Sequence, residues 1–152
     1  MAEELKIRIK DYRKTEDKLL KLGAKFTREL SVIDTYFKQP PGVVLKITKD
    51  DRGDFLVNLK SKDGKFKIVK YEKISNADEL HQELAAKHGI KCVLKKKRRF
   101  FKLADYTINI NLIEDVGEFL IVEGEKVKPE FITKRLGIKK PEHITVSFDE
   151  LK

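Results

Sequence analysis

The most concentrated chemical feature of the chain is a basic run, Lys95–Arg99, which two phenylalanines follow. Basic runs interleaved with aromatic side chains bind single-stranded nucleic acid by charge and stacking, and they also act as nuclear localisation signals. On a strand, alternate residues point to opposite faces, so Lys96 and Arg98 share one face. The other face carries Lys95, Lys97 and Arg99. One face can therefore bind an anion within the fold while the other binds nucleic acid.

The same alternation of charged and apolar residues begins the chain. Glu4, Lys6 and Arg8 are interleaved with Leu5 and Ile7, which predicts a strand with one polar and one apolar face. The formal net charge of +9 favours anionic partners such as phosphates, nucleotides, nucleic acid or membrane surfaces. A solvated, lysine- and glutamate-rich surface, as in proteins from hot environments, is the alternative explanation of this composition.

Several other kinds of chemistry have no support in the sequence. We find no Ser-His-Asp or Cys-His constellation, and His81, His88 and His143 lack metal-ligand spacing, so we interpret them as surface residues. The glycines fall at turns and not in a phosphate-binding loop. A single cysteine, Cys92, and the lack of a long apolar run or a signal peptide predict a cytoplasmic protein without a membrane partner.

Strands dominate the elements that must position these charges. Alternating patterns bounded by turn residues predict eight strands, at 4–10, 31–38, 43–49, 54–60, 65–72, 91–102, 107–112 and 118–125. Turns are predicted at 40–42, 51–53, 63–64 and 116–117.

Three helices are predicted between the strands. The first runs over 12–22 with Asp11 as N-cap, and the second over 76–88 with Ser75 as N-cap and Gly89 as its stop. The third begins near Pro129 and ends at Gly137.

Strands joined mostly by short turns predict an antiparallel sheet within one domain, 1–152, and favour its closure. The pattern leaves two arrangements open. In a sandwich the polar faces meet solvent, whereas in a closed tunnel with helices outside they line the interior. A weak likeness between 18–25 and 83–91 suggests two related halves.

An ordered set of motifs resembles the CYTH superfamily of class IV adenylyl cyclases, thiamine triphosphatases and inorganic triphosphatases. The family's opening Glu-x-Glu-x-Lys is matched by Glu4 and Lys6, with Ala2 at the first position. Leu-Gly-Ala at 22–24 follows, and then Asp-Thr-Tyr-Phe at 34–37, in which Asp34 and Tyr36 are expected to order a strand end.

The middle of the chain continues the resemblance. An arginine pair in the family corresponds to Lys46 and Thr48, and a phosphate-binding lysine on the next strand corresponds to Lys60. The family's Lys-x-Arg-x-x-Tyr strand is similar to the stretch that contains Lys96 and Arg98.

The last motifs lie in 110–123. Ile-Asn-Leu-Ile at 110–113 resembles Leu-Asp-x-Val, with Asn111 at the acidic position. Val-Gly-Glu-Phe resembles Leu-Gly-x-Phe, and the family's Phe-x-Glu-x-Glu retains Glu123 but has Ile121 at its other acidic position. The tail at 147–151 resembles a terminal aromatic-plus-leucine segment.

The resemblance implies an α+β fold. Its core is a closed antiparallel eight-stranded β tunnel with helices packed outside and two pseudo-related halves, and the tunnel encloses a triphosphate. Charge-assisted contacts to phosphate contribute roughly 1.5–3 kcal/mol each. The cations that would make them are Lys6, Arg8, Lys46, Lys60, Lys96 and Arg98.

The family's chemistry also requires a divalent metal, Mg²⁺ or Mn²⁺, bound by carboxylates and phosphate oxygens. Here Glu4, Glu123 and Asn111 stand at these positions. Because Ala2, Asn111 and Ile121 lack the carboxylates of the pattern, metal affinity is expected to be weaker.

Three functional hypotheses follow. The first is a metal-dependent enzyme that hydrolyses inorganic triphosphate, thiamine triphosphate or a nucleotide, or that cyclises ATP like a class IV adenylyl cyclase. The second is a polyphosphate- or nucleotide-binding protein with weakened or lost catalysis, motivated by the missing carboxylates. The third is a nucleic-acid-binding protein that uses 91–102. A triphosphate-containing small molecule is thus the first expected partner and nucleic acid the second; the oligomeric state is not indicated.

Overall fold

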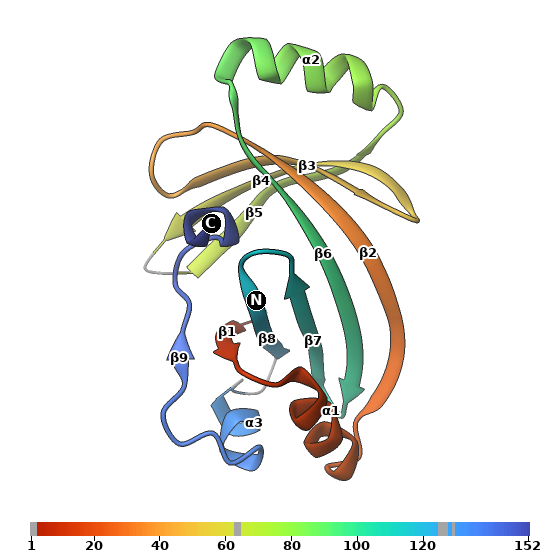
Figure 1. Ribbon diagram of the computed structural model, residues 1–152, viewed down its shortest axis with the longest axis vertical. Helices are drawn as coiled ribbons and strands as arrows, with labels where there is room; N and C mark the ends of the chain where they lie inside the picture. The colour runs from red at the N-terminus through yellow and green to blue at the C-terminus, as the bar shows by residue number, and fades with distance from the viewer. Residues whose placement is uncertain (1–2, 63–64, 125–127, 129) are drawn as a thin grey trace. The chain divides into compact units, whose positions relative to one another are not determined.

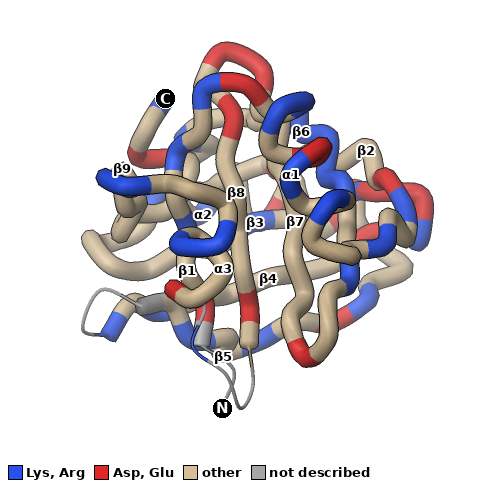
Figure 2. Tube along the Cα trace, turned by 90° about the horizontal axis from the view of Figure 1, so that it is seen from below, with Lys and Arg blue, Asp and Glu red and all other residues tan. Residues whose placement is uncertain are grey.

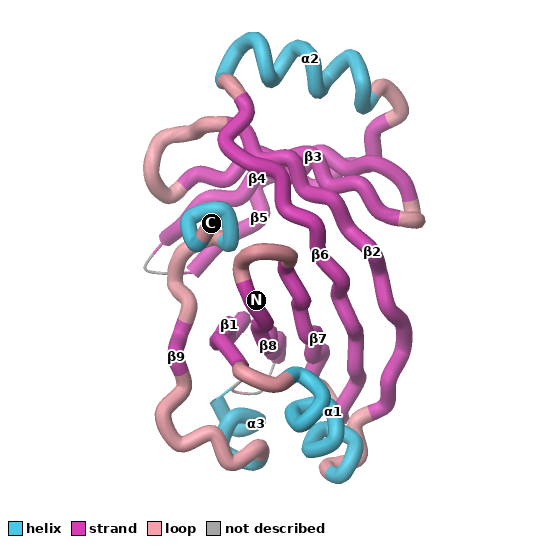
Figure 3. Tube along the Cα trace, in the orientation of Figure 1, coloured by secondary structure: helices cyan, strands magenta, loops and turns pink. Residues whose placement is uncertain are grey.

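A computed structural model describes residues 3–62, 65–124, 128 and 130–152. Its strands pair in the order β5-β4-β3-β2-β6-β7-β8-β1-β9, and every register that is defined is antiparallel. The strands are β1 (Glu3–Ile9), β2 (Lys25–Phe37), β3 (Val43–Asp50), β4 (Gly53–Lys62), β5 (Lys65–Ile74), β6 (Ile90–Leu103), β7 (Tyr106–Ile113), β8 (Gly117–Gly124) and β9 (Glu142–His143). The helices are α1 (Tyr12–Lys21), α2 (Ala77–His88), α3 (Glu130–Arg135) and the short 3-10 turn η1 (Phe148–Leu151) (Figures 1 and 3).

The α+β class and the antiparallel sheet are therefore confirmed. Among the described residues the sheet has nine strands, one more than the eight predicted, and the additional strand is β9. Strands β5 and β9 stand at the two ends of the pairing order. Closure into an eight-stranded tunnel remains a prediction. No helix among the described residues is both long and apolar enough to cross a membrane.

The chain divides into two compact units. The first contains the residues up to Leu30, Lys97–Ile113 and Gly117–Ile144, and the second contains Ser31–Lys96, Glu114–Val116 and Thr145–Lys152. The long strands β2 and β6 contribute one end to each unit.

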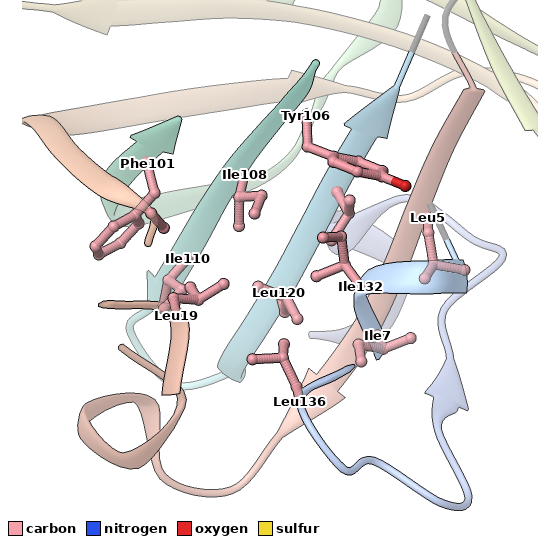
Figure 4. Packing of buried hydrophobic residues seen from close by; sticks show 12 residues of the cluster. Leu5, Ile7, Leu19, Phe101, Tyr106, Ile108, Ile110, Leu120, Ile132 and Leu136 are labelled. Atoms are coloured by element: carbon pink, nitrogen blue, oxygen red, sulfur yellow. The ribbon is translucent and has the colours of Figure 1, made fainter. Parts of the chain in front are cut away.

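The first unit has a hydrophobic core between one face of β1, β7 and β8 and two helices (Figure 4). Ile7, Ile108 and Leu120 lie on this face, Leu19 comes from α1 and Ile132 from α3, and all five are fully buried. Asp11 caps α1 by accepting hydrogen bonds from the backbone N–H groups of residues 13 and 14. This cap satisfies donors that a helix leaves unpaired at its start.

The second unit is built on β3, β4, β5 and the adjoining ends of β2 and β6. Helix α2 lies beside this sheet (Figure 1), where His81 contacts the ring of Phe37 edge to face, with 5.7 Å between the ring centroids. No residue of α2 is fully buried. The helix ends at Gly89, whose φ of 83° suits glycine.

Most predicted elements occur close to their expected positions, with two notable differences. Strand β2 begins at Lys25, not at 31, because 25–29 is exposed on both faces and has one apolar residue, Phe26, so it carries no apolar alternation. The N-cap of α2 is Asn76, not the predicted Ser75, and the Asn76 side chain makes no capping hydrogen bond. The predicted turn at 63–64 and the predicted start of the third helix at Pro129 lie outside the described residues.

Candidate functional site

Three neighbouring strands of the first unit, β7, β8 and β1, place polar residues on one face. Directly opposed residues of antiparallel strands point to the same face. The rows across β1, β8 and β7 are Glu4, Glu123 and Thr107; Lys6, Ile121 and Asn109; and Arg8, Phe119 and Asn111. The core residues occupy the opposite face, so the predicted placement of Glu4, Lys6 and Arg8 on one face of their strand holds, and Asn111 and Glu123 share that face of the sheet.

Two of these residues, Glu4 and Glu123, form a carboxylate pair. Glu4 is exposed and Glu123 is half-buried. Burial, and then the charge of Glu4 and a hydrogen bond with it, raise the pKa of Glu123 from 4.5 to about 7. Two carboxylates in contact disfavour ionisation of both, so one of them retains a proton well above its usual pH range.

The guanidinium of Arg98 acts on the same pair, because its charge lowers the pKa of Glu123 and partly offsets the rise. The Arg98 Cζ atom lies 5.2 Å from the centroid of the Phe100 ring. Among the buried side-chain N and O atoms of the described residues, Arg98 Nε is the one without a hydrogen-bond partner. A buried donor without a partner lowers the stability of the folded state, so a ligand oxygen that accepts a hydrogen bond from Arg98 Nε would be stabilising.

Arg8, the next predicted phosphate ligand, is held at the other end of β1. Its Nε lies 2.7 Å from Glu142 Oε2 on β9, and its Cζ lies 4.9 Å from the centroid of Phe119. A Cβ atom at Gly117 would come within 2.7 Å of Arg8 Nη1. The absence of a side chain at 117 therefore gives the guanidinium its space.

Asn111 and Asn109 complete this face on β7. Both are buried, and the Asn111 side-chain amide donates to Asn109 Oδ1. With Ile121 beside them, Glu4 and Glu123 are the two carboxylates of the face. Within the part of the chain that the structure describes, no group of three or more His, Cys, Asp or Glu side chains is placed to hold a metal ion.

The second unit contains a different cluster, centred on the buried Asp34. Lys96 Nζ and Lys46 Nζ lie 2.6 and 2.8 Å from Asp34 Oδ2, and Thr48 donates to Oδ1 at 2.6 Å. Lys96 also donates to the Tyr36 hydroxyl at 2.9 Å. Burial alone would raise the pKa of Asp34, but the two ammonium groups outweigh it and hold that pKa well below its usual range.

Tyr36 and the C-terminal turn support Lys96 in this cluster. Burial, and then the charge of Asp34, raise the pKa of Tyr36 well above its ordinary value, so it remains a neutral phenol. The ring of Phe148 in η1 lies 4.9 Å from Lys96 Nζ. Lys91 Nζ fixes the same turn through contacts of 2.9 Å to Asp149 and 2.6 Å to Glu150.

Lys60 is the predicted phosphate ligand that the structure does not bring to this cluster. The β3–β4 register places Val57 opposite Lys46 and Val43 opposite Lys60. Alternation then puts Lys60 on the other face of the sheet from Lys46, where it is exposed. This placement corrects the expectation that Lys60 converges with Lys46 and Lys96.

The outward cations of the basic run differ in availability. Lys95 and Lys97 are exposed, whereas the Arg99 guanidinium forms ion pairs with Glu16 and Glu29 and stacks at 4.7 Å on the ring of Phe26. Arg99 therefore stabilises the first unit, and the nucleic-acid hypothesis keeps two of its three outward cations.

The sequence predicted a structural role for Asp34 but not its ion pairs with Lys46 and Lys96, and it missed the Glu142 partner of Arg8. The signal for Asp34 was the two-residue spacing to Tyr36, which places both on one face of a strand together with Thr48 and Lys46 of the next strand. Glu142 had no signal, because β9 is two residues long and its pairing is distant in sequence.

Comparison with known proteins finds similar proteins whose matches extend over nearly the whole chain. No family model matches. A Methanocaldococcus jannaschii protein named as a candidate adenylate cyclase is 32% identical, and the match covers 98% of this chain and 97% of that protein. Among solved structures, the PH1012 protein of Pyrococcus horikoshii matches with a TM-score of 0.84 and 25% identity, over 99% of each chain.

A third similarity is to a Hippeastrum protein, described as a candidate adenylyl cyclase with a dominant triphosphatase activity. It matches with a TM-score of 0.66 and 16% identity, over 97% of this chain and 92% of that one. At this identity the match shows a shared fold.

Proposed function

Because this chain belongs to the CYTH superfamily, we propose that it binds a triphosphate compound together with Mg²⁺ or Mn²⁺ and hydrolyses it. The observation that carries the proposal is the Glu4–Glu123 pair. Its charge repulsion and burial raise the pKa of Glu123 to about 7, and the buried Arg98 Nε beside it has no partner. A metal-bound phosphate would add a cation to the pair, beside the charge of Arg98, and would give Arg98 Nε an acceptor.

The donor set fits a divalent ion of this kind. Mg²⁺ is commonly bound by one or two carboxylates together with substrate phosphate oxygens, and Glu4 and Glu123 provide two carboxylates. Asn111 lies opposite Phe119, four residues along β8 from Glu123, or roughly 13 Å at the rise of a strand. It is therefore left out of the proposed metal ligands. When bound, the ion would neutralise charge that develops on the phosphate oxygens.

The cations of the first unit would orient the phosphates. Lys6 lies on the strand between Glu4 and Arg8 and shares their face, while Arg98 offers Nε as a donor. Guanidinium groups suit phosphate because their donors form a planar fork.

Lys46 and Lys96 were also predicted as phosphate ligands; they lie in the second unit, and for them this role stays a prediction. Lys60 is left out of the set because it lies on the opposite face of β4.

Hydrolysis is favoured over cyclisation because it requires only an oriented water, whereas cyclisation also requires a bound nucleoside with its 3′ oxygen in line. The triphosphatase activity described for the Hippeastrum protein supports the same choice.

The test measures phosphate release from each of the three compounds with Mg²⁺, with Mn²⁺ and with chelator. We expect metal-dependent release that Glu123→Ala abolishes, while Glu83→Ala, an exposed glutamate of α2, retains it. Metal-independent release, or release that survives Glu123→Ala, would contradict the proposal.

A second candidate is a binding protein without turnover. Ile121 offers no ligand and Asn111 is bonded to Asn109, so the face holds a smaller carboxylate set than the family pattern implies. A thermal-shift panel with the same three compounds, each with and without Mn²⁺, separates the candidates, because a ligand that binds only the folded state stabilises it whether or not it is turned over. Stabilisation without phosphate release would support the binding protein.

A further inference from the structure

Strand β5 stands at one end of the sheet and exposes several large apolar side chains. It pairs with β4, and the described pairings give it no second neighbour. All residues from 67 to 73 are exposed, and Ile68, Val69 and Tyr71 retain 69%, 60% and 47% of their accessible surface. An edge strand with exposed apolar side chains is a template for pairing with another strand.

A β-bulge decides which of these side chains share a face. The β4–β5 register shifts at Asn58 and Leu59, so that Lys70 lies opposite Asn58 and Ile68 opposite Leu59, and Val69 is the extra residue. Because of this extra residue, Ile68 and Tyr71 lie on one face although they are three apart. Lys67 and Glu72 share the other face for the same reason.

We propose that two copies of this chain associate through β5, antiparallel and related by a two-fold axis between residues 69 and 70. In this register Lys67 lies opposite Glu72 of the second copy and Ile68 lies opposite Tyr71 of the second copy. Two-fold symmetry makes each of these pairs twice. Opposed residues fall on the same face in both cases, as strand pairing requires.

The bulge and the charges together select this register. Without the extra residue, Ile68 and Tyr71 would point to opposite faces and could not meet across a symmetric strand pair. A shift of two residues sets Lys67 against Lys70 of the other copy, which repels. Glu72 already lies 3.4 Å from Lys70 of its own strand, but both side chains are about half exposed and such a pair contributes little.

The charge on β5 also limits the strength of the association. Pairing of one short strand buries less surface than a permanent interface requires. The dimer is therefore weak and reversible, and it is sensitive to salt because its ion pairs lie at an exposed edge.

The experiment follows the oligomeric state of the full chain by sedimentation over a wide range of protein concentrations. The wild type is expected to show a reversible monomer–dimer equilibrium. Lys67→Glu and Glu72→Lys each replace two attractions by two repulsions, and each should raise the dissociation constant about tenfold or more. The double variant restores opposite charges at both pairs and should return the constant close to the wild-type value.

Two further variants complete the test. Ile68→Asp should abolish the dimer, while Lys102→Glu, the same charge change at an exposed lysine of the interior strand β6, should leave it unchanged. Circular dichroism melting checks that each variant is folded.

A wild type that remains monomeric throughout, or a dimer that Lys67→Glu and Ile68→Asp leave intact, overturns the proposal. A double variant that is no better than the single ones does the same. Another contrary result is a wild type that stays monomeric and binds an acidic peptide or an oligonucleotide in a way that Ile68→Asp abolishes. That result would assign the β5 edge to another partner and would also overturn the dimer.

Discussion

The two polar clusters of the molecule shift the pKa of their buried carboxylates in opposite directions. In the second unit one buried carboxylate, Asp34, is shared by two ammonium groups and a hydroxyl at 2.6–2.8 Å. In the first unit two carboxylates, Glu4 and Glu123, lie together, and the pKa of Glu123 is raised to about 7. In the second unit the neighbouring ammonium groups offset the charge of Asp34. In the first unit the two carboxylates repel each other, and a bound proton or cation relieves this repulsion.

This difference separates structural charge from functional charge. A carboxylate whose pKa is depressed by its neighbours stabilises the folded state, whereas one whose pKa is raised destabilises it at neutral pH unless something binds. Perturbed acids of the second kind cluster at functional sites. The Glu4–Glu123 pair is thus the better candidate for ligand chemistry, and Asp34 is the better candidate for the framework that positions Lys46 and Lys96.

Removing the carboxylate at the centre of the second unit's cluster should have the largest effect. Asp34→Asn leaves Lys46 and the buried Lys96 without their counter-charge, and loss of one partner of a buried ion pair costs roughly 3–5 kcal/mol. Urea unfolding at neutral pH measures the loss. Thr48→Val removes only the hydroxyl bond to Asp34 and should cost about 1 kcal/mol. A loss for Asp34→Asn no larger than that for Thr48→Val would refute the structural assignment.

The corresponding change in the first unit's cluster should have the opposite sign. In metal-free buffer the folded protein holds a proton on Glu123 up to about pH 7, while the unfolded chain releases it near 4.5. The unfolding free energy therefore falls as pH rises between these values. Glu123→Gln removes this penalty, so at about pH 8 it should be more stable than the wild type by about 1–2 kcal/mol.

Urea unfolding across this pH range checks the prediction, with Glu83→Gln on α2 as the matched control. The advantage of Glu123→Gln should disappear near pH 4, where Glu123 is protonated in both states. A variant that is less stable than the wild type at pH 8 would show that the glutamate pair is balanced by groups of the chain itself.

Metal binding offers a finer test of the same pair. A divalent ion requires ionised carboxylates and so competes with the proton on Glu123. Below about pH 7 the apparent affinity for Mn²⁺ should fall by up to about tenfold per pH unit, and above it the affinity should level off. Isothermal titration of the wild type at several pH values gives this profile. A flat profile would mean that Glu123 is not a ligand.

The sequence predicted the parts of this contrast that depend on local periodicity. Alternation in 4–8 set the faces of Glu4 and Lys6, and alternation in 95–99 separated Lys96 and Arg98 from Lys95, Lys97 and Arg99. Local periodicity did not predict the registers between strands. The face of Lys60 depends on the length of the β3–β4 turn, and a one-residue change of register exchanges the faces of a strand.

Partners distant in sequence were equally inaccessible. That Asp34 balances Lys96 depends on the meeting of β2 and β6, more than fifty positions apart, and no local pattern encodes it. The raised pKa of Glu123 likewise arises from burial and then from the charge of Glu4, which is distant in the sequence. Composition gave the net positive charge, but Lys and Arg are spread over elements such as α1 and β6 (Figure 2), so the charge total did not indicate which cations act together.

The ion pair between Arg8 and Glu142 should show the smallest effect, because exposure, and not charge alone, decides what such pairs contribute. The two side chains are 36% and 63% exposed, and pairs of this kind contribute about 0–1 kcal/mol. Glu142→Gln should therefore change the unfolding free energy by no more than about 0.5 kcal/mol, whereas Lys91→Met, which removes the partner of the buried Asp149, should cost distinctly more. If Glu142→Gln proved as damaging as Lys91→Met, burial would not be what distinguishes structural ion pairs in this protein, and the separation of the two clusters by the same criterion would fail with it.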